Sequence, residues 1–327
     1  MQLIDSHGRR LDYVRLAVID RCNLRCHYCM PVHGIDFVKR SDLLSYEEML
    51  RLLKIFKNLG VTKLRITGGE PLLRKDLSGF LDEVTSQEIF SGYHLTTNAT
   101  LTEPHIDRLI DSGLRSVNIS LDTLNQQRFK EITHRDSFGS VMSSLQQFLD
   151  RNVAVKLNMV VMKHVNEEDI IPMAELARHS KVSVRFLEEM PFDGKDEVKP
   201  SFFTHHDILD KLKKGIGPLT QLPYKSGETS TNYVAEGWKG ELGIIASYSR
   251  TFCGTCNRLR ITPTGKLKTC LYSKNDLDLR QLLRDGSSDA EIAVAIQNAV
   301  SRKHIDGVEA ERDRDQHINE SMASIGG

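Results

Sequence analysis

The sequence predicts an α/β protein built around a parallel β-sheet, and three observations support this prediction. Short apolar or β-branched runs alternate with amphipathic segments of helical period from residue 13 to about residue 190. Turn-forming residues separate the two kinds of segment. Polar and reactive residues come directly after several of the apolar runs. Strands that alternate with helices form right-handed crossovers, so the strands are expected to be parallel.

Six strands are expected in this part of the chain, over Tyr13–Ile19, Lys63–Thr67, Tyr93–Thr97, Ser116–Leu121, Ala154–Val161 and Ser183–Glu188. Ser45 and Glu48 form a capping box at the start of the first helix, which Gly60 ends. Thr102 is expected to cap a later helix that ends at Gly113. The alternation fits either an open part of an eight-fold barrel or a doubly wound sheet, and both place active sites at the carboxyl ends of strands.

The pattern changes from about residue 191. Residues 191–200 are polar and turn-rich, so we expect two domains, residues 1–190 and 191–327. The second is predicted to hold a helix over Thr204–Lys214, short strands within Asn232–Ser249, a hairpin of Arg258–Thr262 and Lys266–Tyr272, and a last helix capped by Ser288 and Glu291. The charged stretch 306–316 is expected to be solvated.

Composition argues against several classes of protein. The 44 basic and 44 acidic side chains cancel, so no global charge favours nucleic acid or a membrane surface. No apolar stretch reaches transmembrane length, and the first ten residues lack the apolar core of a secretory signal. These features favour the cytoplasm, where thiols stay reduced and grouped cysteines more often bind metal than form disulfides.

The cysteines form two sets of three. The first is Cys22, Cys26 and Cys29 in a C-x3-C-x2-C run, and the second is Cys253 and Cys256 in a C-x2-C pair completed by Cys270. A closed zinc site or iron–sulfur cluster takes four protein ligands. Three thiolates leave one position free, which suggests substrate binding. The alternatives are three disulfides, or zinc sites whose fourth ligand is one of the histidines 27, 33, 205, 206 or 304.

The first cysteine set resembles that of the radical S-adenosylmethionine (SAM) superfamily, with Tyr28 before the last cysteine and Gly68-Gly69-Glu70-Pro71 after the second strand. The resemblance implies that Cys22, Cys26 and Cys29 hold a [4Fe–4S] cluster whose free iron binds SAM and cleaves it to a 5′-deoxyadenosyl radical. The implied SAM contacts are Tyr28, Gly69, Glu70, Ser120 and Met190. Without the resemblance, these would be read as a turn, a strand-end serine and a buried methionine.

The whole pattern, from Tyr13 to the terminal Gly326-Gly327, resembles the MoaA family of GTP 3′,8-cyclases through its Cys253-x2-Cys256-Asn-Arg-Leu-Arg…Cys270 segment. The resemblance implies an incomplete (β/α)6 TIM-like barrel of the radical SAM type, with a C-terminal extension covering the open side. It also implies a second [4Fe–4S] cluster, held by Cys253, Cys256 and Cys270, that binds the guanine of GTP.

In the implied reaction the deoxyadenosyl radical takes hydrogen from the ribose C3′ of GTP, and the C3′ radical attacks C8 of guanine. Reduction then gives 3′,8-cyclo-7,8-dihydro-GTP for molybdenum cofactor biosynthesis. The implied partners are an electron donor, a downstream cyclic pyranopterin monophosphate synthase and possibly a second copy of the chain, with no membrane and no nucleic acid.

The residues that the resemblance assigns to GTP are Arg15, Lys63, Arg65, Thr96, Lys156, Arg185, Arg258, Leu259 and Arg260. Arg258 and Arg260 are two apart, so they share one face of a strand and can hold a polyphosphate with two guanidinium groups. The family resemblance also implies that Gly326 and Gly327 reach into the site and support catalysis. One departure is Ala99, where relatives more often carry glycine after the asparagine.

Two other functions remain open at this point. One is a radical SAM enzyme that modifies peptides, although such enzymes usually carry more cysteines in the C-terminal region. The other is a zinc-stabilised nucleic-acid-binding protein, which neutral charge and few aromatic residues disfavour.

Overall fold

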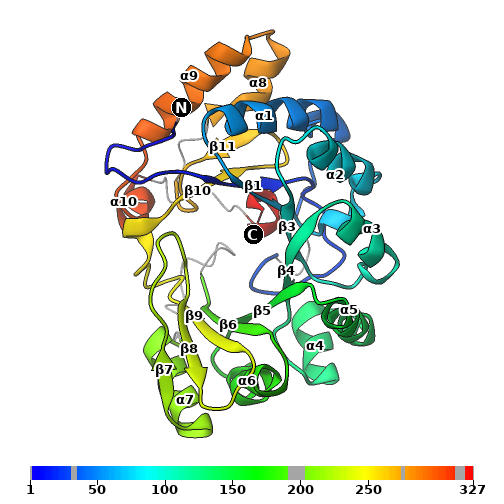
Figure 1. Cartoon of the computed structure of the whole chain (residues 1–327), viewed down its shortest axis with the longest axis vertical. Helices are drawn as coiled ribbons and strands as arrows, with labels where there is room; N and C mark the ends of the chain where they lie inside the picture. Colours follow the sequence, from blue (N-terminus) through cyan, green and yellow to red (C-terminus); the bar gives the residue numbers. More distant parts are fainter. Residues whose placement is uncertain (1, 31–34, 191–202, 274–276, 314–320, 327) are drawn as a thin grey trace.

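The computed structural model describes residues 2–30, 35–190, 203–273, 277–313 and 321–326. Figure 1 shows a strongly curved sheet with helices around its outer side and the C-terminal segment inside the curve. The strands are β1 (Tyr13–Ala17), β2 (Lys63–Thr67), β3 (Tyr93–Thr97), β4 (Leu114–Ser120), β5 (Ala154–Val161), β6 (Ser183–Glu188), β7 (Leu219–Gln221), β8 (Thr231–Ala235), β9 (Glu241–Ile245), β10 (Arg258–Ile261), β11 (Lys266–Lys268) and β12 (Leu277–Asp278). The six predicted strands of the first half are therefore present.

The helices follow the amphipathic segments of the sequence. They are α1 (Tyr46–Asn58), α2 (Leu77–Ser86), α3 (Ile106–Asp111), α4 (Gln126–Thr133), α5 (Phe138–Asp150), α6 (Ile170–His179), α7 (His205–Ile216), α8 (Leu279–Arg284), α9 (Asp289–Ser301), α10 (Gly307–Arg312) and α11 (Met322–Ile325). Both predicted capping boxes are confirmed, at Ser45 with Glu48 and at Ser288 with Glu291. Within the described ranges, no helix is both long enough and apolar enough to cross a membrane.

The described strands form one sheet in the order β12-β11-β10-β1-β2-β3-β4-β5-β6-β9-β8-β7. The central strands from β10 to β9 are all parallel, and the outer strands pair antiparallel. This order confirms an incomplete barrel, since β12 and β7 are separate edges in the described part of the chain. The C-terminal half extends the sheet at both edges, so its segments face one another across the interior. The division into two domains stays a prediction, because residues 191–202 lie outside the described residues.

Some predicted boundaries were wrong for physical reasons. β1 ends at Ala17 because the chain then turns toward the glycines after β2. Thr102 does not cap a helix with its side chain, since its hydroxyl donates to the Ala99 carbonyl at 3.2 Å. A 3₁₀ turn containing Pro104 comes first, and α3 begins only at Ile106. In the described part of the charged stretch, residues 306–313, the charged Glu309, Glu311, Arg312 and Asp313 are exposed as expected, while α10 buries Gly307 and Ala310.

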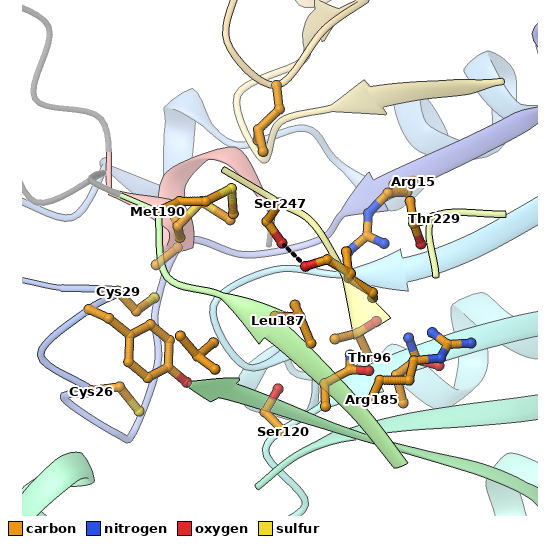
Figure 2. A pocket seen from close by; sticks show the side chains of 18 of the residues that line it. Arg15, Cys26, Cys29, Thr96, Ser120, Arg185, Leu187, Met190, Thr229 and Ser247 are labelled. Carbon is orange, nitrogen blue, oxygen red and sulfur yellow. Dashed lines mark hydrogen bonds between the residues drawn. The ribbon is translucent and has the colours of Figure 1, made fainter. Parts of the chain in front are cut away.

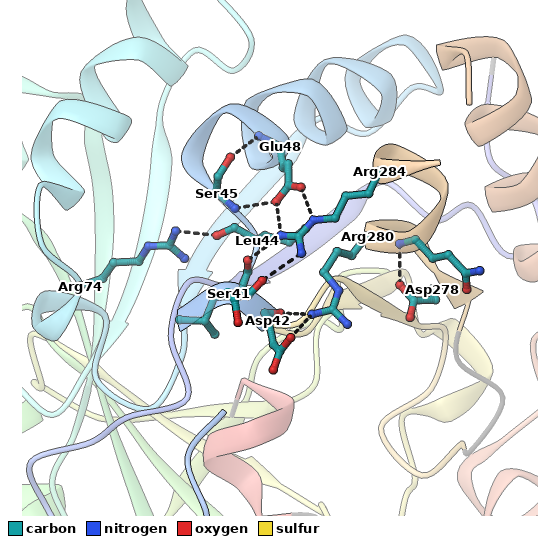
Figure 3. A network of polar contacts seen from close by, with 11 residues as sticks. Ser41, Asp42, Leu44, Ser45, Glu48, Arg74, Asp278, Arg280 and Arg284 are labelled. Atoms are coloured by element: carbon teal, nitrogen blue, oxygen red, sulfur yellow. Dashed lines mark hydrogen bonds and ion pairs between the residues drawn. The ribbon is translucent and has the colours of Figure 1, made fainter. Parts of the chain in front are cut away.

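A polar network joins α8 of the C-terminal half to the segment before α1 (Figure 3). Arg284 donates to both carboxylate oxygens of Glu48, at 2.7 and 3.2 Å, and to the carbonyls of Ser41 and Leu43, at 2.9 and 3.1 Å. From the other side, Arg74 donates to the Leu44 carbonyl at 2.6 Å. The segment that follows the first cysteine loop is therefore fixed by both halves of the chain.

Candidate functional site

Both cysteine sets open onto one cavity of about 330 Å³ inside the curve of the sheet. Figure 2 shows Cys26 and Cys29 at one end of this cavity and Arg15 and Arg185 at the other. The sequence-predicted site residues that line it are Arg15, Cys22, Cys26, Tyr28, Cys29, Gly69, Thr96, Ser120, Arg185, Met190, Cys253, Cys256, Arg258, Arg260 and Cys270. Residues from the whole length of the chain therefore meet at one place.

All six cysteines are free thiols, so the disulfide alternative was wrong. In the described part of the chain, no three Cys, His, Asp or Glu side chains lie close enough together to hold one metal ion. A single zinc ion would need its sulfur ligands about 2.3 Å from the metal. In a four-iron cube each thiolate binds a different iron, so the thiolates can lie further apart.

The first cysteine loop has strongly perturbed thiols. Burial raises the pKa of Cys29 to about 12 and raises the pKa of Cys26 well above its ordinary value. The charge of Asp122 and the neighbouring thiols add to both effects. Metal-bound thiols must be deprotonated, so this loop needs a positively charged group to hold them as thiolates. Three soft ligands facing one cavity fit an iron–sulfur cluster on chemical grounds.

The paired glycines after β2 allow that strand to pack against the start of the cysteine loop. Gly69 N–H donates to the Ile19 carbonyl at 2.7 Å, and Glu70 N–H donates to the Arg21 carbonyl at 2.8 Å. A Cβ on Gly69 would lie 2.3 Å from the Arg21 carbonyl oxygen. We expected these glycines to make room for a ligand, whereas the contact seen here is between two segments of backbone.

Glu70 is fully buried and lies behind the cavity wall. Its carboxylate accepts from the Thr97 hydroxyl and from the Asn98 N–H, both at 2.8 Å. Burial raises the pKa of Glu70 to about 7. The Asn98 side chain in turn donates to the Cys22 sulfur at 3.6 Å, so Glu70 supports the cysteine loop through this turn. The departure at Ala99 is accommodated in the left-handed conformation, with a φ of 59°.

Tyr28 is held by a carboxylate at the end of β4. Its hydroxyl donates to Asp122 Oδ2 at 2.9 Å, and the Val160 N–H donates to Oδ1 at 2.9 Å. Burial raises the pKa of Asp122 to about 6. This arrangement fixes the aromatic ring beside Cys26 and Cys29 on the cavity wall.

The second cysteine set has a different electrostatic environment. Burial alone would raise the pKa of Cys256, but the positive charges of Arg258 and Lys303 lower it to about 6. Two of the alternative zinc ligands are engaged elsewhere, since His304 lies 2.7 Å from Asp313 and His205 lies 2.9 Å from Glu188. Both triplets line one cavity. Burial and Asp122 raise the pKa of Cys26 and Cys29 in the first, whereas in the second burial raises the pKa of Cys253 and nearby cations lower that of Cys256.

Cations from three adjacent strands form rows inside the sheet. Arg15 on β1 is in register with Arg65 on β2 and Arg260 on β10, and Tyr13 is in register with Lys63 and Arg258. Register partners project to the same face, so like charges lie directly opposite one another. Burial and repulsion from neighbouring cations lower the pKa of Arg15 to about 9.

β5 and β6 also carry positively charged side chains with lowered pKa values. Burial and nearby cations lower the pKa of Lys156 to about 8 and that of Arg185 to about 10. Arg185 Nε and Arg260 Nη1 are buried without a hydrogen-bond partner among the described residues. Unpartnered buried donors are costly, so this wall is suited to a ligand with several negative charges.

Six predicted site residues are described but do not line the cavity: Lys63, Arg65, Glu70, Lys156, Leu259 and Gly326. Arg65 instead donates to the Tyr13 hydroxyl at 2.5 Å and to the Leu95 carbonyl at 2.8 Å. Leu259 is fully buried in the hydrophobic core between its two arginine neighbours. On a strand, alternate residues face opposite sides, which explains why the arginines and Leu259 separate.

Sequence reasoning missed three polar residues of the site. Asn118 and Asn158 line the cavity, and each has a buried Oδ1 without a hydrogen-bond partner in the described ranges. Their positions, two residues before Ser120 and two after Lys156, could have revealed them because alternate strand residues share a face. Tyr13 is the third; burial would raise its pKa, but Arg65 and Arg15 lower it to about 7.

The C-terminal segment enters the site from inside the curve of the sheet (Figure 1). The Ser321 hydroxyl donates to the Cys29 carbonyl at 2.6 Å, and Met322 and Ala323 line the cavity. Gly326 has a φ of 84°, and a Cβ there would lie 2.5 Å from the Ala17 Cβ. Glycine is therefore required at 326 by both conformation and space. Gly327 lies outside the described residues.

Comparison with known families divides the chain between two family models. The Radical SAM superfamily model matches residues 16–177, and the Molybdenum Cofactor Synthesis C model matches residues 182–307. The solved structure of Streptococcus suis SuiB bound to S-adenosylmethionine has a TM-score of 0.59 at 16% identity, and the match covers 89% of this chain and 69% of SuiB. This similarity supports the fold alone.

Curated relatives are considerably more similar in sequence. The molybdenum cofactor biosynthesis protein moc-5 of Caenorhabditis elegans is 37% identical over 91% of this chain, which spans about half (50%) of that relative's length. GTP 3′,8-cyclase of Thermodesulfovibrio yellowstonii is 36% identical, and the match covers 91% of this chain and 94% of the relative. For the GTP 3′,8-cyclase of Desulforamulus reducens the identity is 36%, with 99% of this chain and 100% of the relative covered. The chain therefore belongs to the GTP 3′,8-cyclase family of the radical SAM superfamily.

Proposed function

We propose that this protein is a radical SAM GTP 3′,8-cyclase, which converts GTP to 3′,8-cyclo-7,8-dihydro-GTP in the first step of molybdenum cofactor biosynthesis. The observation that carries the proposal is that two cysteine triplets and the partly buried Arg15, Arg185, Arg258 and Arg260 line the same cavity. Membership of the cyclase family supports the same assignment. The peptide-modifying and nucleic-acid-binding alternatives do not account for this wall of cations inside the sheet.

One end of the cavity is proposed to hold SAM. Cys22, Cys26 and Cys29 would hold a [4Fe–4S] cluster, which supplies the electron for cleaving SAM to the radical that takes the C3′ hydrogen. The chain's own residues position the cofactor. Tyr28, fixed by Asp122, and the lining residues Gly69, Ser120 and Met190 are the proposed SAM contacts. Glu70 would act on this end indirectly, through the Asn98 turn, rather than by touching SAM.

The other end is proposed to hold GTP. Cys253, Cys256 and Cys270 would hold the second cluster beside the guanine base. Arg258 and Arg260, together with Arg15 and Arg185 of the barrel, would bind the triphosphate. Thr96, which also lines the cavity, is the proposed contact from β3. Lys63, Arg65 and Lys156 do not line the cavity and would add positive charge near these arginines.

An enclosed binding site for the substrate would favour the proposed cyclisation. Holding the ribose and the base in one fixed geometry favours the intramolecular ring closure over reactions of a free radical. Met322 and Ala323 line the cavity, and Ser321 binds the Cys29 carbonyl. Gly326 and Gly327 are proposed to support catalysis from this end of the chain.

The cellular context is proposed from the same chemistry. Six free cysteines indicate a reducing compartment, and we propose the cytoplasm. We also propose an electron donor and a following enzyme, a cyclic pyranopterin monophosphate synthase, that accepts the product. A homodimer, which the family resemblance implies, is proposed as well. We propose that residues 1–190 generate the radical and that residues 191–327 hold the base.

Anaerobic incubation of the reconstituted protein with GTP, SAM and a reductant tests the proposal. The expected products are 5′-deoxyadenosine and a cyclised nucleotide, from a protein carrying about eight irons per chain. Absence of both products from protein that contains both clusters would refute it. Failure to bind GTP, together with cleavage of SAM, would favour the peptide-modifying alternative.

Removing one cysteine from each triplet should separate their roles. Cys22→Ala is expected to abolish SAM cleavage, because the first cluster loses a ligand. Cys270→Ala is expected to retain SAM cleavage while GTP binding and cyclisation fall sharply. The measurements are 5′-deoxyadenosine yield and GTP binding by calorimetry. Full cyclase activity in Cys270→Ala would show that the second triplet does not hold the base.

Removing one buried guanidinium should weaken triphosphate binding without damaging the fold. Arg260→Met is expected to lower GTP affinity about 10–100-fold, since hydrogen bonds between charged groups contribute about 1.5–3 kcal/mol. The thermal midpoint of the free protein should stay the same or rise, because a buried cation among cations is removed. Arg178→Ala, exposed on α6, is the control. An equal loss of guanosine affinity would contradict a role at the phosphates.

GTP affinity should fall as pH rises through about 8. The pKa of Lys156 is about 8 in the free protein, and bound GTP would raise it, so above pH 8 binding requires proton uptake. The expected slope is up to about ten-fold per pH unit. Lys156→Arg should flatten it, because arginine stays charged throughout this range. A residual slope in Lys156→Arg is assigned to Tyr13, whose pKa is about 7; an unchanged slope in both Lys156→Arg and Tyr13→Phe would contradict the prediction.

A further inference from the structure

The residues before β1 form a compact turn that lies outside both matched family models. An isolated bridge pairs Ile4 with Arg10. The Asp5 carboxylate organises the turn, since it accepts from the His7 N–H at 3.0 Å, the Arg9 N–H at 2.9 Å and Arg9 Nε at 2.6 Å. Asp5 is 5% exposed and Arg9 is 9% exposed, so this ion pair is buried rather than a surface contact.

The remaining donors of Arg9 leave the turn and reach two distant segments. Nη1 donates to the Cys253 carbonyl at 3.0 Å and to the Ile305 carbonyl at 2.6 Å. Nη2 donates to the His304 carbonyl at 2.5 Å. One planar guanidinium thus joins the first cysteine of the second triplet to the segment that follows α9. A lysine ammonium has no such fixed fork.

The segment after Ile305 also contacts the cysteine itself. The Gly307 N–H, at the start of α10, forms a hydrogen bond with the Cys253 sulfur. Arg250 donates to the Gly307 carbonyl at 3.1 Å and lies 4.0 Å from the centre of the Tyr272 ring. A Cβ on Gly307 would lie 3.0 Å from both Arg250 and Tyr272 side-chain atoms, so this segment has little freedom. Arg9 therefore binds the carbonyl of Cys253 and the carbonyls of His304 and Ile305, which come just before the donor to the sulfur.

The first triplet depends on other contacts. Its loop is held by the glycines after β2, by Asn98 and by Ser321, none of which touches the N-terminal turn in the contacts described above. A change at Arg9 should therefore act on one triplet only. Buried ion pairs give little net stability, so the main effect of the Asp5–Arg9 pair is to fix geometry.

We infer that Arg9, held by Asp5, is a positioning residue that shapes the second cysteine triplet to retain its iron–sulfur cluster. This inference rests on the proposed function, because it assigns a role in holding the cluster that binds GTP. It concerns residues that neither matched model includes.

The test compares Arg9→Ala with the wild-type protein after anaerobic reconstitution. Iron and sulfide content should fall from about eight toward about four per chain, with loss of one of the two cluster signals in electron paramagnetic resonance. SAM cleavage should persist, and GTP affinity should fall at least about ten-fold, because only the second cluster is affected. Cys270→Ala provides the reference spectrum for loss of the second cluster. Arg10→Ala, an exposed neighbour in the same turn, is the control and should behave as the wild type.

The outcomes separate the inference from the proposed function. Two intact clusters and unchanged GTP affinity in Arg9→Ala would overturn the inference while leaving the proposed function standing. Parallel loss of both clusters would also overturn it, since Arg9 would then support the whole fold. If Arg9→Ala does not fold, Arg9→Lys decides, and retention of both clusters there overturns the inference. A wild-type protein with only one cluster would refute the proposed function itself.

Discussion

Buried positive charge is the constraint on which the rest of this structure depends. Arginines from β1, β2 and β10 stand side by side in register inside the sheet, and further cations project from β5 and β6. The positive charges within these rows repel one another, and water does not screen the repulsion. Apolar packing around the strands must therefore stabilise an interior that is unfavourable by itself. A polyanion in the cavity would make this arrangement favourable. The protein therefore loses stability in the free state and gains a binding site for the polyanion.

Tyr13 shows how the protein reduces this cost without an external anion. Its hydroxyl accepts from Arg65, and the Lys63 ammonium lies 4.7 Å from the centre of its ring. A phenol that ionises easily can offset part of the charge when the cavity is free. The two cysteine triplets also differ in their electrostatic environments. The first set is buried near Asp122, whereas the second is adjacent to Arg258 and Lys303. The two ends of the cavity therefore offer different electrostatic environments to the groups that bind there.

The cavity is built by segments that are remote in sequence. The glycines after β2 let that strand approach the cysteine loop, and Ser321 binds the same loop from the opposite end of the chain. The N-terminal turn fixes the second triplet through Arg9, while Arg284 of α8 holds the segment that follows the first. Arg9 near the start of the chain and Ser321 near its end each contact the backbone of a cysteine.

The sequence by itself determined the α/β class, the six strands of the first half, the two capping boxes at Ser45 and Ser288, and the two cysteine sets. Periodicity and capping are local properties of the sequence, so they can be recognised without knowledge of the fold. It could not choose between a barrel and a doubly wound sheet except through the family resemblance. Only the tertiary structure decided that β10 and β9 join opposite edges of one sheet and bring both triplets to one cavity. It also showed that Glu70 does not line the cavity, that Leu259 belongs to the core, that Asn118 and Asn158 line the cavity and that Arg9 binds the Cys253 carbonyl. These features depend on strand order and on contacts between distant segments, and no local pattern records which segments will meet.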